Sequence, residues 1–366
     1  MTLPCRIALA SLSLFLCVLP AATQQPKPDT NDIPDSFTAP KRNPAAPFKP
    51  APDYIRRVEM IPMRDGVKLY TVIMIPKGAM RAPIVLTRTC YNAAARSAAS
   101  RATSGLGAPP MANPGPGRGA GADNKREAST HLIDELGLPD EIFVKAGYIR
   151  VYQDVRGKYG SEGQYIMTPP PVNSGWNGTG ADDTMDAYDT IDWLIKNVPE
   201  SNGKVGMIGS SYEGFTVVMA LLNPHPALKV AAPESPMVDG WMGDDWFHYG
   251  AFRTTNLDYF LGQTTARGQG TRVTREHRDE YTNFLEMGST GDMARWLGED
   301  QLPAWKNVEA HPAYDAFWQS HALDKLAAAK TPTVPTMWLQ GLWDQEDMWG
   351  LFTATALSSQ WTRPTP

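Results

Sequence analysis

The sequence predicts an α/β fold, in which strands and helices alternate along the chain. Three stretches carry this prediction. GYIRVYQDVRG (147–157) has the pattern of a strand that ends in a turn, and DAYDTIDWLIKN (186–197) places apolar residues at helical spacing. KVGMIGSSYEGFTVVMALLN (204–223) has the pattern of a strand, a turn and a helix. Such alternation indicates a parallel sheet with crossover helices.

The stretches on either side follow in chain order. Residues 54–78 hold two apolar runs split by the turn signal Arg64-Asp65-Gly66, which predicts a β-hairpin. APIVLTRTCYN (82–92) predicts a buried strand. Residues 92–125 are rich in Ala, Gly, Ser and Pro without periodicity and predict a surface insertion. TPTVPTMWLQGLWDQED (331–347) predicts a further strand followed by an acidic loop.

The N-terminus predicts export. Residues 1–23 contain one Arg, an apolar run and then small residues, which is the layout of a secretory signal peptide; the alternative is an uncleaved apolar N-terminus. The run is shorter than the roughly 20 apolar residues that a bilayer requires. Residues 24–52, rich in Pro and polar residues, predict an extended arm that could embrace a second copy in a homo-oligomer. We therefore expect a secreted or periplasmic protein.

The bulk composition narrows the class of protein. The 366 residues are 42% hydrophobic and 20% charged, which suffices for about two domains. Lys and Arg number 34 against 39 Asp and Glu, without a basic cluster, which argues against a nucleic-acid partner. Only Cys90 lies beyond the leader, so no internal disulfide is expected. The sequence has no metal-ligand spacing or nucleotide-binding glycine loop, so we expect no cofactor.

Ser211 is the strongest candidate for a catalytic residue. It lies in a sharp turn between an apolar strand and a helix, with Gly209 and Gly214 on either side. Glycines there let strand and helix approach closely, while the hydroxyl faces out at the helix N-terminus, where free amides favour a developing oxyanion. The alternative is a chance Gly-x-Ser turn, and the second Gly stands three residues after Ser211 rather than two. The flanking strand and helix favour the nucleophile.

Five ordered motifs over residues 54–360 resemble one hydrolase family. GSSYEG (209–214) resembles the Gly-x-Ser-Tyr-x-Gly motif of the cocaine esterase and X-Pro dipeptidyl-peptidase group. Four further motifs of the group are matched by RTCYN, DVRGKYGSEG, GDDWFHYGAFR and GLWDQEDMWG. Within the group, the chain looks like an α-amino acid ester hydrolase. The resemblance implies an α/β-hydrolase fold with an inserted helical cap.

The resemblance also implies roles for individual residues. Ser211 would attack the carbonyl carbon, and the Tyr91 hydroxyl with the Tyr212 backbone N–H would form the oxyanion hole. Without the resemblance, Tyr91 would be a strand-end anchor. Asp344 follows an apolar strand and suits the acid that orients a catalytic histidine; alone it would be a solvated turn residue.

An acidic cluster is implied as the site for the substrate's α-ammonium group. The matching positions are Asp245, Glu346 and Asp347. An acidic surface patch is the alternative. In DVRG, Asp154 and Arg156 are expected to form a structural ion pair that shapes the turn, without a catalytic contact.

The chain departs from the family in one respect. The order Ser, Asp, His requires a histidine after Asp344, and all six histidines precede it. We expect most of these to be satisfied by local hydrogen bonds. The expected organisation is a hydrolase domain at 53–240 and 331–366 with a helical cap at 241–330. The last part of the sheet and the family's C-terminal jelly-roll domain are expected to be missing, as in a fragment.

The sequence is compatible with three functions. The first is hydrolysis or acyl transfer on α-amino acid esters and α-amino β-lactams through a Ser acyl-enzyme, nearly inactive in this chain because the base is missing. The second is an X-Pro dipeptidyl-peptidase or another carboxylesterase of the group. The third is a non-catalytic protein that binds amino compounds. The first predicts a small-molecule ester or amide substrate with a free α-amino group.

Overall fold

The computed structural model describes residues 54–97, 138–243, 246–253, 257–268, 279–330, 333–344, 347 and 349–350. The predicted signal peptide and arm, and most of the predicted insertion, lie outside these ranges. The described chain is centred on a mixed six-stranded sheet in the order β1-β2-β4-β3-β5-β6. Its strands are β1 (Tyr54–Pro62), β2 (Lys68–Pro76), β3 (Ala82–Thr89), β4 (Ile149–Asp154), β5 (Ser201–Ser211) and β6 (Leu228–Pro236).

The sheet combines a hairpin with a parallel core. β1 and β2 pair antiparallel from Tyr54↔Pro76 to Pro62↔Lys68, which confirms the predicted hairpin, and Gly66 takes a positive φ of 87° in its turn. β2 joins β4 antiparallel, whereas β3, β4, β5 and β6 pair in parallel. Strands with parallel pairing have their carboxyl ends at one edge, so the residues that follow β3, β4, β5 and β6 lie along that edge.

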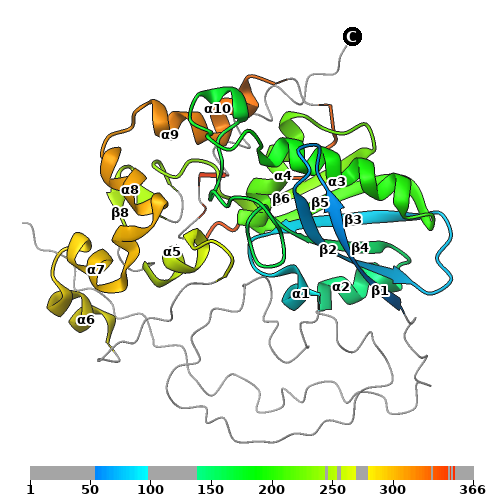
Figure 1. The fold of residues 1–366 in the computed structure, drawn as a ribbon, viewed down its shortest axis with the longest axis horizontal. Coiled ribbons are helices and arrows are strands. Elements are labelled where there is room, and N and C mark those ends of the chain that lie inside the picture. The colour runs from blue at the N-terminus through cyan, green and yellow to red at the C-terminus, as the bar shows by residue number, and fades with distance from the viewer. Residues whose placement is uncertain are drawn as a thin grey trace, which may run out of the picture. The chain divides into compact units, whose positions relative to one another are not determined.

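Helices cover both faces of the sheet. α3 (Asp183–Asn197) and α4 (Tyr212–Leu222) lie on one face, and α1 (Ala93–Arg96) and α2 (Leu138–Lys145) on the other (Figure 1). The predicted helical spacing is confirmed in α3, since Ala187, Ile191 and Leu194 are buried. They share one apolar cluster with strand residues that include Ile73, Ile84, Leu86, Val151 and Val205.

A seventh strand segment extends the sheet at β6. Residues 334–339 pair in parallel with β6 through the bridges Ala231↔Thr336 and Glu234↔Leu339. Met337 N–H donates to the Ala231 carbonyl at 2.9 Å, and Ser235 N–H donates to the Leu339 carbonyl at 2.8 Å. The stretch therefore lies against β6 where a strand was predicted, but it pairs through two isolated bridges rather than as a continuous strand, and the loop after it begins at the carboxyl edge.

Short helices make up most of residues 257–268 and 279–328. Two of them, α6 (Glu280–Met287) and α7 (Thr290–Leu297), form from HRDEYTNFLEMG and DMARWLGE, within the stretch expected to be helical. No helix in the described ranges is long and apolar enough to cross a membrane. The helices are α5 (Leu257–Thr264), α6 (Glu280–Met287), α7 (Thr290–Leu297), α8 (Pro303–Ala310), α9 (Ala316–His321) and α10 (Leu323–Ala328); before them lies the two-stranded ribbon β7 (Phe247–His248) and β8 (Ala251–Phe252).

Candidate active site

Ser211 occupies the bend between β5 and α4. Its backbone has φ 59° and ψ −121°, a region that residues with a Cβ rarely adopt. A Cβ added at Gly209 would lie 2.6 Å from backbone and side-chain atoms of Glu213, and one at Gly214 would lie 2.8 Å from the Glu234 carbonyl oxygen. Only glycine therefore fits these two positions, and its lack of a Cβ lets β5 and β6 approach the start of α4 closely.

The start of α4 provides free backbone donors beside Ser211. Ser211 is the N-cap residue of α4, and its side chain makes no capping hydrogen bond. The first N–H groups of a helix have no acceptor within the helix, and the helix dipole adds partial positive charge there. Tyr212 is the first of these residues, and its ring is fully buried. The predicted oxyanion donor at the Tyr212 N–H thus lies next to Ser211 at the helix N-terminus.

Tyr91 follows β3, the neighbour of β5, and reaches the same edge. Its ring meets the Tyr212 ring edge-on, with centroids 6.4 Å apart. Its hydroxyl lies 2.6 Å from the Tyr259 hydroxyl and accepts a hydrogen from the Gln263 side-chain amide at 2.9 Å. The sequence-predicted Tyr91 and Tyr212 are thus brought together. Tyr259 and Gln263, both on α5, were not predicted.

Asp344 lies in the loop after segment 334–339, as expected. One carboxylate oxygen accepts from the Asp347 N–H at 3.2 Å, and the other lies 3.5 Å from the Gln340 side-chain amide. Gln340 also donates to the Ser235 hydroxyl at 3.1 Å, and Ser235 belongs to the end of β6. This chain of contacts ties the Asp344 loop to the strand beside Ser211.

The predicted acidic cluster is described only in part. Asp347 is buried, with 3% of its surface exposed, and its backbone N–H contacts Asp344. Asp245 and Glu346 lie outside the described residues. Within the described ranges, no group of three or more His, Cys, Asp or Glu side chains is placed to hold a metal ion.

Three histidines have local partners, as the sequence predicted. His225 precedes β6 at the amino edge of the sheet, opposite Ser211, where its Nδ1 accepts from Ala227 N–H at 3.0 Å. His311 lies 2.7 Å from Asp315. His321 Nδ1 lies 2.6 Å from the Phe317 carbonyl oxygen, and burial lowers the pKa of this imidazole to about 4. His248 lies in β7, and His131 and His277 lie outside the described residues.

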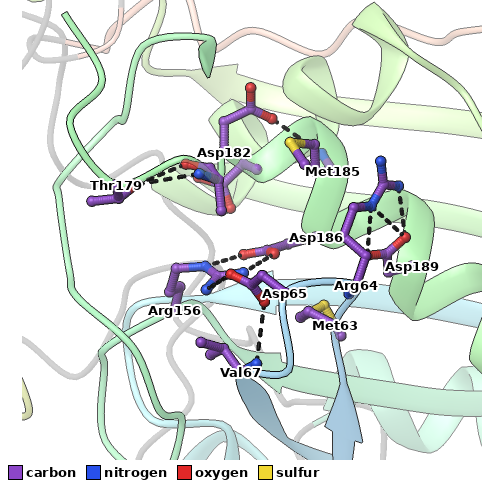
Figure 2. A network of polar contacts seen from close by, with 12 residues as sticks. Met63, Arg64, Asp65, Val67, Arg156, Thr179, Asp182, Met185, Asp186 and Asp189 are labelled. Atoms are coloured by element: carbon purple, nitrogen blue, oxygen red, sulfur yellow. Dashed lines mark hydrogen bonds and ion pairs between the residues drawn. The ribbon is translucent and has the colours of Figure 1, made fainter.

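The predicted ion pair between Asp154 and Arg156 is wrong. Arg156 instead pairs with Asp186 at 2.6 Å and with Asp65 at 2.7 Å (Figure 2). Asp154 accepts from the backbone N–H of Ala93 at 2.6 Å and of Gly160 at 3.2 Å, and burial raises the pKa of its carboxyl to about 6. The Asp154 carboxyl faces the start of α1, where the buried backbone N–H of Ala93 needs a hydrogen-bond acceptor.

A further ion pair links α1, which follows Tyr91, to α4, which follows Ser211. Arg96, at the end of α1, lies 2.8 Å from Glu213 on α4, and Glu213 is buried. Coulombic attraction by Glu213 raises the pKa of Arg96. With Asp154 at the start of α1, this pair fixes the segment after Tyr91 at both ends. This pair was not predicted; the acidic residue inside the Ser-Tyr-Glu-Gly motif is the sequence signal that could have indicated it.

Comparisons with known proteins agree with these features. The family model described as X-Pro dipeptidyl-peptidase (S15 family) matches residues 65–359. Cocaine esterase of Rhodococcus sp. (strain MB1 Bresler) is 27% identical over 298 residues, 77% of this chain and 43% of that protein.

Two solved structures are similar over most of the chain. A selenomethionine-labelled α-amino acid ester hydrolase is 56% identical with a TM-score of 0.72, covering 87% of this chain and 48% of that one. An aminopeptidase from the marine sediment archaeon Thaumarchaeota archaeon is 45% identical with a TM-score of 0.73, covering 86% and 47%. The α/β-hydrolase-like fold is therefore confirmed. The chain spans less than half the length of these relatives.

Proposed function

The chain belongs to the X-Pro dipeptidyl-peptidase (S15) family, and we propose that it carries the acyl-transfer site of a serine hydrolase for α-amino acid esters and α-amino β-lactam amides. The observation that carries the proposal is the strained backbone of Ser211 at a strand-to-helix bend. Such strain persists only where the surroundings enforce it, and it concentrates at functional sites. The likeness to the α-amino acid ester hydrolase supports the substrate class.

In the proposed reaction, the Ser211 Oγ attacks the substrate carbonyl carbon and the leaving alcohol or amine departs with a proton. Water then attacks the acyl-enzyme carbonyl, releases the α-amino acid and returns the proton to Oγ. Negative charge on the carbonyl oxygen in both steps would be stabilised by the Tyr91 hydroxyl and the Tyr212 N–H. Both donors come from segments that buried contacts fix, so little reorganisation would be needed.

We propose Asp245, Glu346 and Asp347 as the site for the substrate's ammonium group. Attraction between one carboxylate and an ammonium is about 1 kcal/mol in water and several times larger where water is excluded. Asp347 is buried, so its charge would act in the second setting. A free α-amino group would then decide which esters react.

The general base is the open part of the proposal. Asp344 would orient an imidazole, yet no histidine follows Asp344 in the sequence. His225 is at the opposite edge of the sheet, and His311 and His321 have local partners. We therefore propose that this chain alone turns over slowly, since losing the triad base costs about 10⁴-fold or more.

Added imidazole provides the test. The 366-residue chain is incubated with phenylglycine methyl ester over a range of imidazole concentrations, and released amino acid is measured. We expect an imidazole-dependent rate that Ser211→Ala abolishes and Ser210→Ala, the adjacent matched control, retains. Subtracting the Ser211→Ala rate removes hydrolysis by imidazole in solution.

The outcomes separate the candidate functions. A rate with N-acetylphenylglycine methyl ester equal to that with the free amine would indicate a general carboxylesterase. Hydrolysis of an X-Pro anilide in preference to the ester would indicate a dipeptidyl-peptidase, which the family description favours as second candidate. Saturable binding of the ester without any Ser211-dependent rate would indicate a binding protein. Fast turnover without imidazole, lost in Ser211→Ala, would refute the proposed dependence on an added base.

A further inference from the structure

The Tyr91 hydroxyl is part of a closed polar cluster with two residues of α5. Tyr259 and Gln263 are four residues apart, so their side chains lie on one face of the helix. The two tyrosine oxygens are 2.6 Å apart, and the Gln263 amide nitrogen lies 2.9 Å from the Tyr91 oxygen and 3.2 Å from the Tyr259 oxygen. Every pair in this cluster is within hydrogen-bond distance.

The direction of the hydrogen bonds in the cluster decides whether the Tyr91 hydroxyl can donate its proton to a substrate. The Gln263 amide has two hydrogens, and each hydroxyl has one. If Tyr259 donates to Tyr91, the Tyr91 oxygen accepts from both Tyr259 and Gln263, and its own proton can be directed to a substrate oxygen. If Tyr91 donates to Tyr259, that proton is committed within the cluster. Negative charge developing on a substrate oxygen favours the first arrangement, because it places a donor at the charge.

The orientation of the Gln263 amide matters in the same way. Gln263 is 2% exposed, and its Oε1 has no hydrogen-bond partner within the part of the chain that the structure describes. Turning the amide over would place this oxygen on the two hydroxyls, and both would then donate to it. The amide nitrogen also lies 3.8 Å from Met237 Sδ, and the Met237 N–H donates to the Ser211 carbonyl at 3.3 Å. Gln263 is therefore close to the strand end beside Ser211.

The end of α5 is fixed to the turn after β4. Lys158 is fully buried, and its ammonium donates to the backbone carbonyls of Gly262, Thr265 and Gly268 at 2.9, 2.5 and 2.7 Å. The Tyr165 hydroxyl donates to the Gln263 carbonyl at 2.7 Å. Arg267 adds a backbone bond to Gly157 and a side-chain bond to Ser161.

From this geometry we propose that Tyr259 and Gln263 are positioning residues, which set the direction of the Tyr91 hydroxyl so that its proton is donated to the oxyanion. The proposal rests on the proposed function, because it takes Tyr91 as an oxyanion donor. It assigns a role in that function to α5, a helix that contacts Tyr91 in space but is distant in sequence from both Tyr91 and Ser211. The α5 pair acts through Tyr91 and need not touch the substrate.

A double-mutant cycle on the imidazole-dependent rate tests the proposal. Tyr91→Phe alone should lower kcat by about 100-fold, as the loss of one oxyanion donor does. Tyr259→Phe and Gln263→Leu should each lower kcat by about tenfold with KM nearly unchanged, because the charge exists only after attack. In the Tyr91→Phe background, both substitutions should have almost no further effect. Thr264→Val, which removes a hydroxyl bonded within α5, is the matched control and should leave the rate unchanged.

Each outcome bears on one of the two proposals. If Tyr91→Phe lowers the rate but the α5 substitutions add their full losses in its background, Tyr259 and Gln263 act independently of Tyr91 and the inference is overturned. If they raise KM rather than lower kcat, they contact substrate, and the inference fails again. If the unaltered chain has no Ser211-dependent rate, the proposed function fails and takes the inference with it.

One further variant tests whether a loss of activity at position 263 comes from misfolding or from the direction of hydrogen bonding. Gln263→Glu keeps the size of the side chain and, where the carboxyl is ionised, has acceptors only, so the Tyr91 proton would be drawn into the cluster. We expect a larger loss of kcat than in Gln263→Leu, at an unchanged circular dichroism spectrum. An equal or higher rate in Gln263→Glu would contradict the proposed direction of donation.

Discussion

The sheet and the helical region, residues 257–268 and 279–328, are held together by different interactions. Around the sheet, buried charges are paired. Arg88, with no exposed surface, lies 2.5 Å from Asp183 and 2.9 Å from Gln153, and Arg150 lies 2.6 Å from Asp140. In the low dielectric of the interior, removing one partner leaves the other as an uncompensated buried charge, which strongly destabilises the folded state. The positions of the strand ends are therefore strongly specified.

The helical region is held mainly by aromatic contacts. The ring centroid of Phe260 lies 4.8 Å from that of Trp246 and 6.0 Å from that of Trp305. The ring centroid of Trp318 lies 5.2 Å from those of both Phe247 and Phe317. Aromatic contacts tolerate several geometries of similar energy, and the ion pair between Arg295 and Asp292 on α7 is exposed on both sides. The candidate site therefore joins two kinds of structure: Ser211 and Tyr91 come from the sheet edge, while the partners of Tyr91 come from α5, a helix with aromatic packing.

The largest expected effect is at a buried charge of the sheet. Arg88→Met removes the cation and leaves Asp183 with an uncompensated buried carboxylate. We expect the free energy of unfolding to fall by about 3–5 kcal/mol, as measured in urea denaturation. Arg88 also lies on β3 just before Tyr91, so the Ser211-dependent rate should fall with it. A loss below about 1 kcal/mol would show that the sheet does not depend on its buried ion pairs.

The next effect is expected at the Ser211 bend. Gly209→Ala brings a methyl group to 2.6 Å from Glu213, which forces strand and helix apart. We expect a loss of about 2–3 kcal/mol in unfolding free energy and about 100-fold in the imidazole-dependent rate, since small displacements of reacting groups are costly. Gly178→Ala is the matched control, because its added Cβ meets nothing within 4 Å. Equal effects in the two variants would contradict a sterically enforced bend.

A pH experiment probes the helical region. Burial lowers the pKa of His321 to about 4, whereas its usual value is 6.5. The unfolded chain therefore takes up a proton below pH 6.5 that the folded chain resists, so this contribution to stability is present above pH 6.5 and is lost as pH falls toward 4. Between pH 8 and pH 5 the contribution of His321 should fall by about 2 kcal/mol, read in urea denaturation as the difference in unfolding free energy between the unaltered chain and the variant His321→Asn. His321→Asn, which keeps a donor for the Phe317 carbonyl, should remove this dependence.

The same contrast explains what the sequence could predict. The Ser211 bend was predictable because its signals are local: two glycines, an apolar strand and a helix within twenty residues of chain. The partners of Tyr91 were not, because Tyr259 and Gln263 are 168 and 172 residues away and meet it only through tertiary packing. The Asp154–Arg156 prediction failed for a similar reason, since Arg156 pairs with Asp65 and Asp186, which are 91 and 30 residues away, and Asp154 accepts from Ala93, 61 residues away.

The smallest effect is expected at an exposed ion pair of the helical region, and it is the sharpest counterpart to Arg88. Arg295 pairs with Asp292 one turn away on α7, and their side chains are 61% and 50% exposed. Water already solvates both charges, so the pair adds little. Arg295→Met should change the free energy of unfolding by less than about 0.5 kcal/mol in urea denaturation. If its loss approached that of Arg88→Met, exposure would not separate the two regions, and the helices would depend on charges as the sheet does.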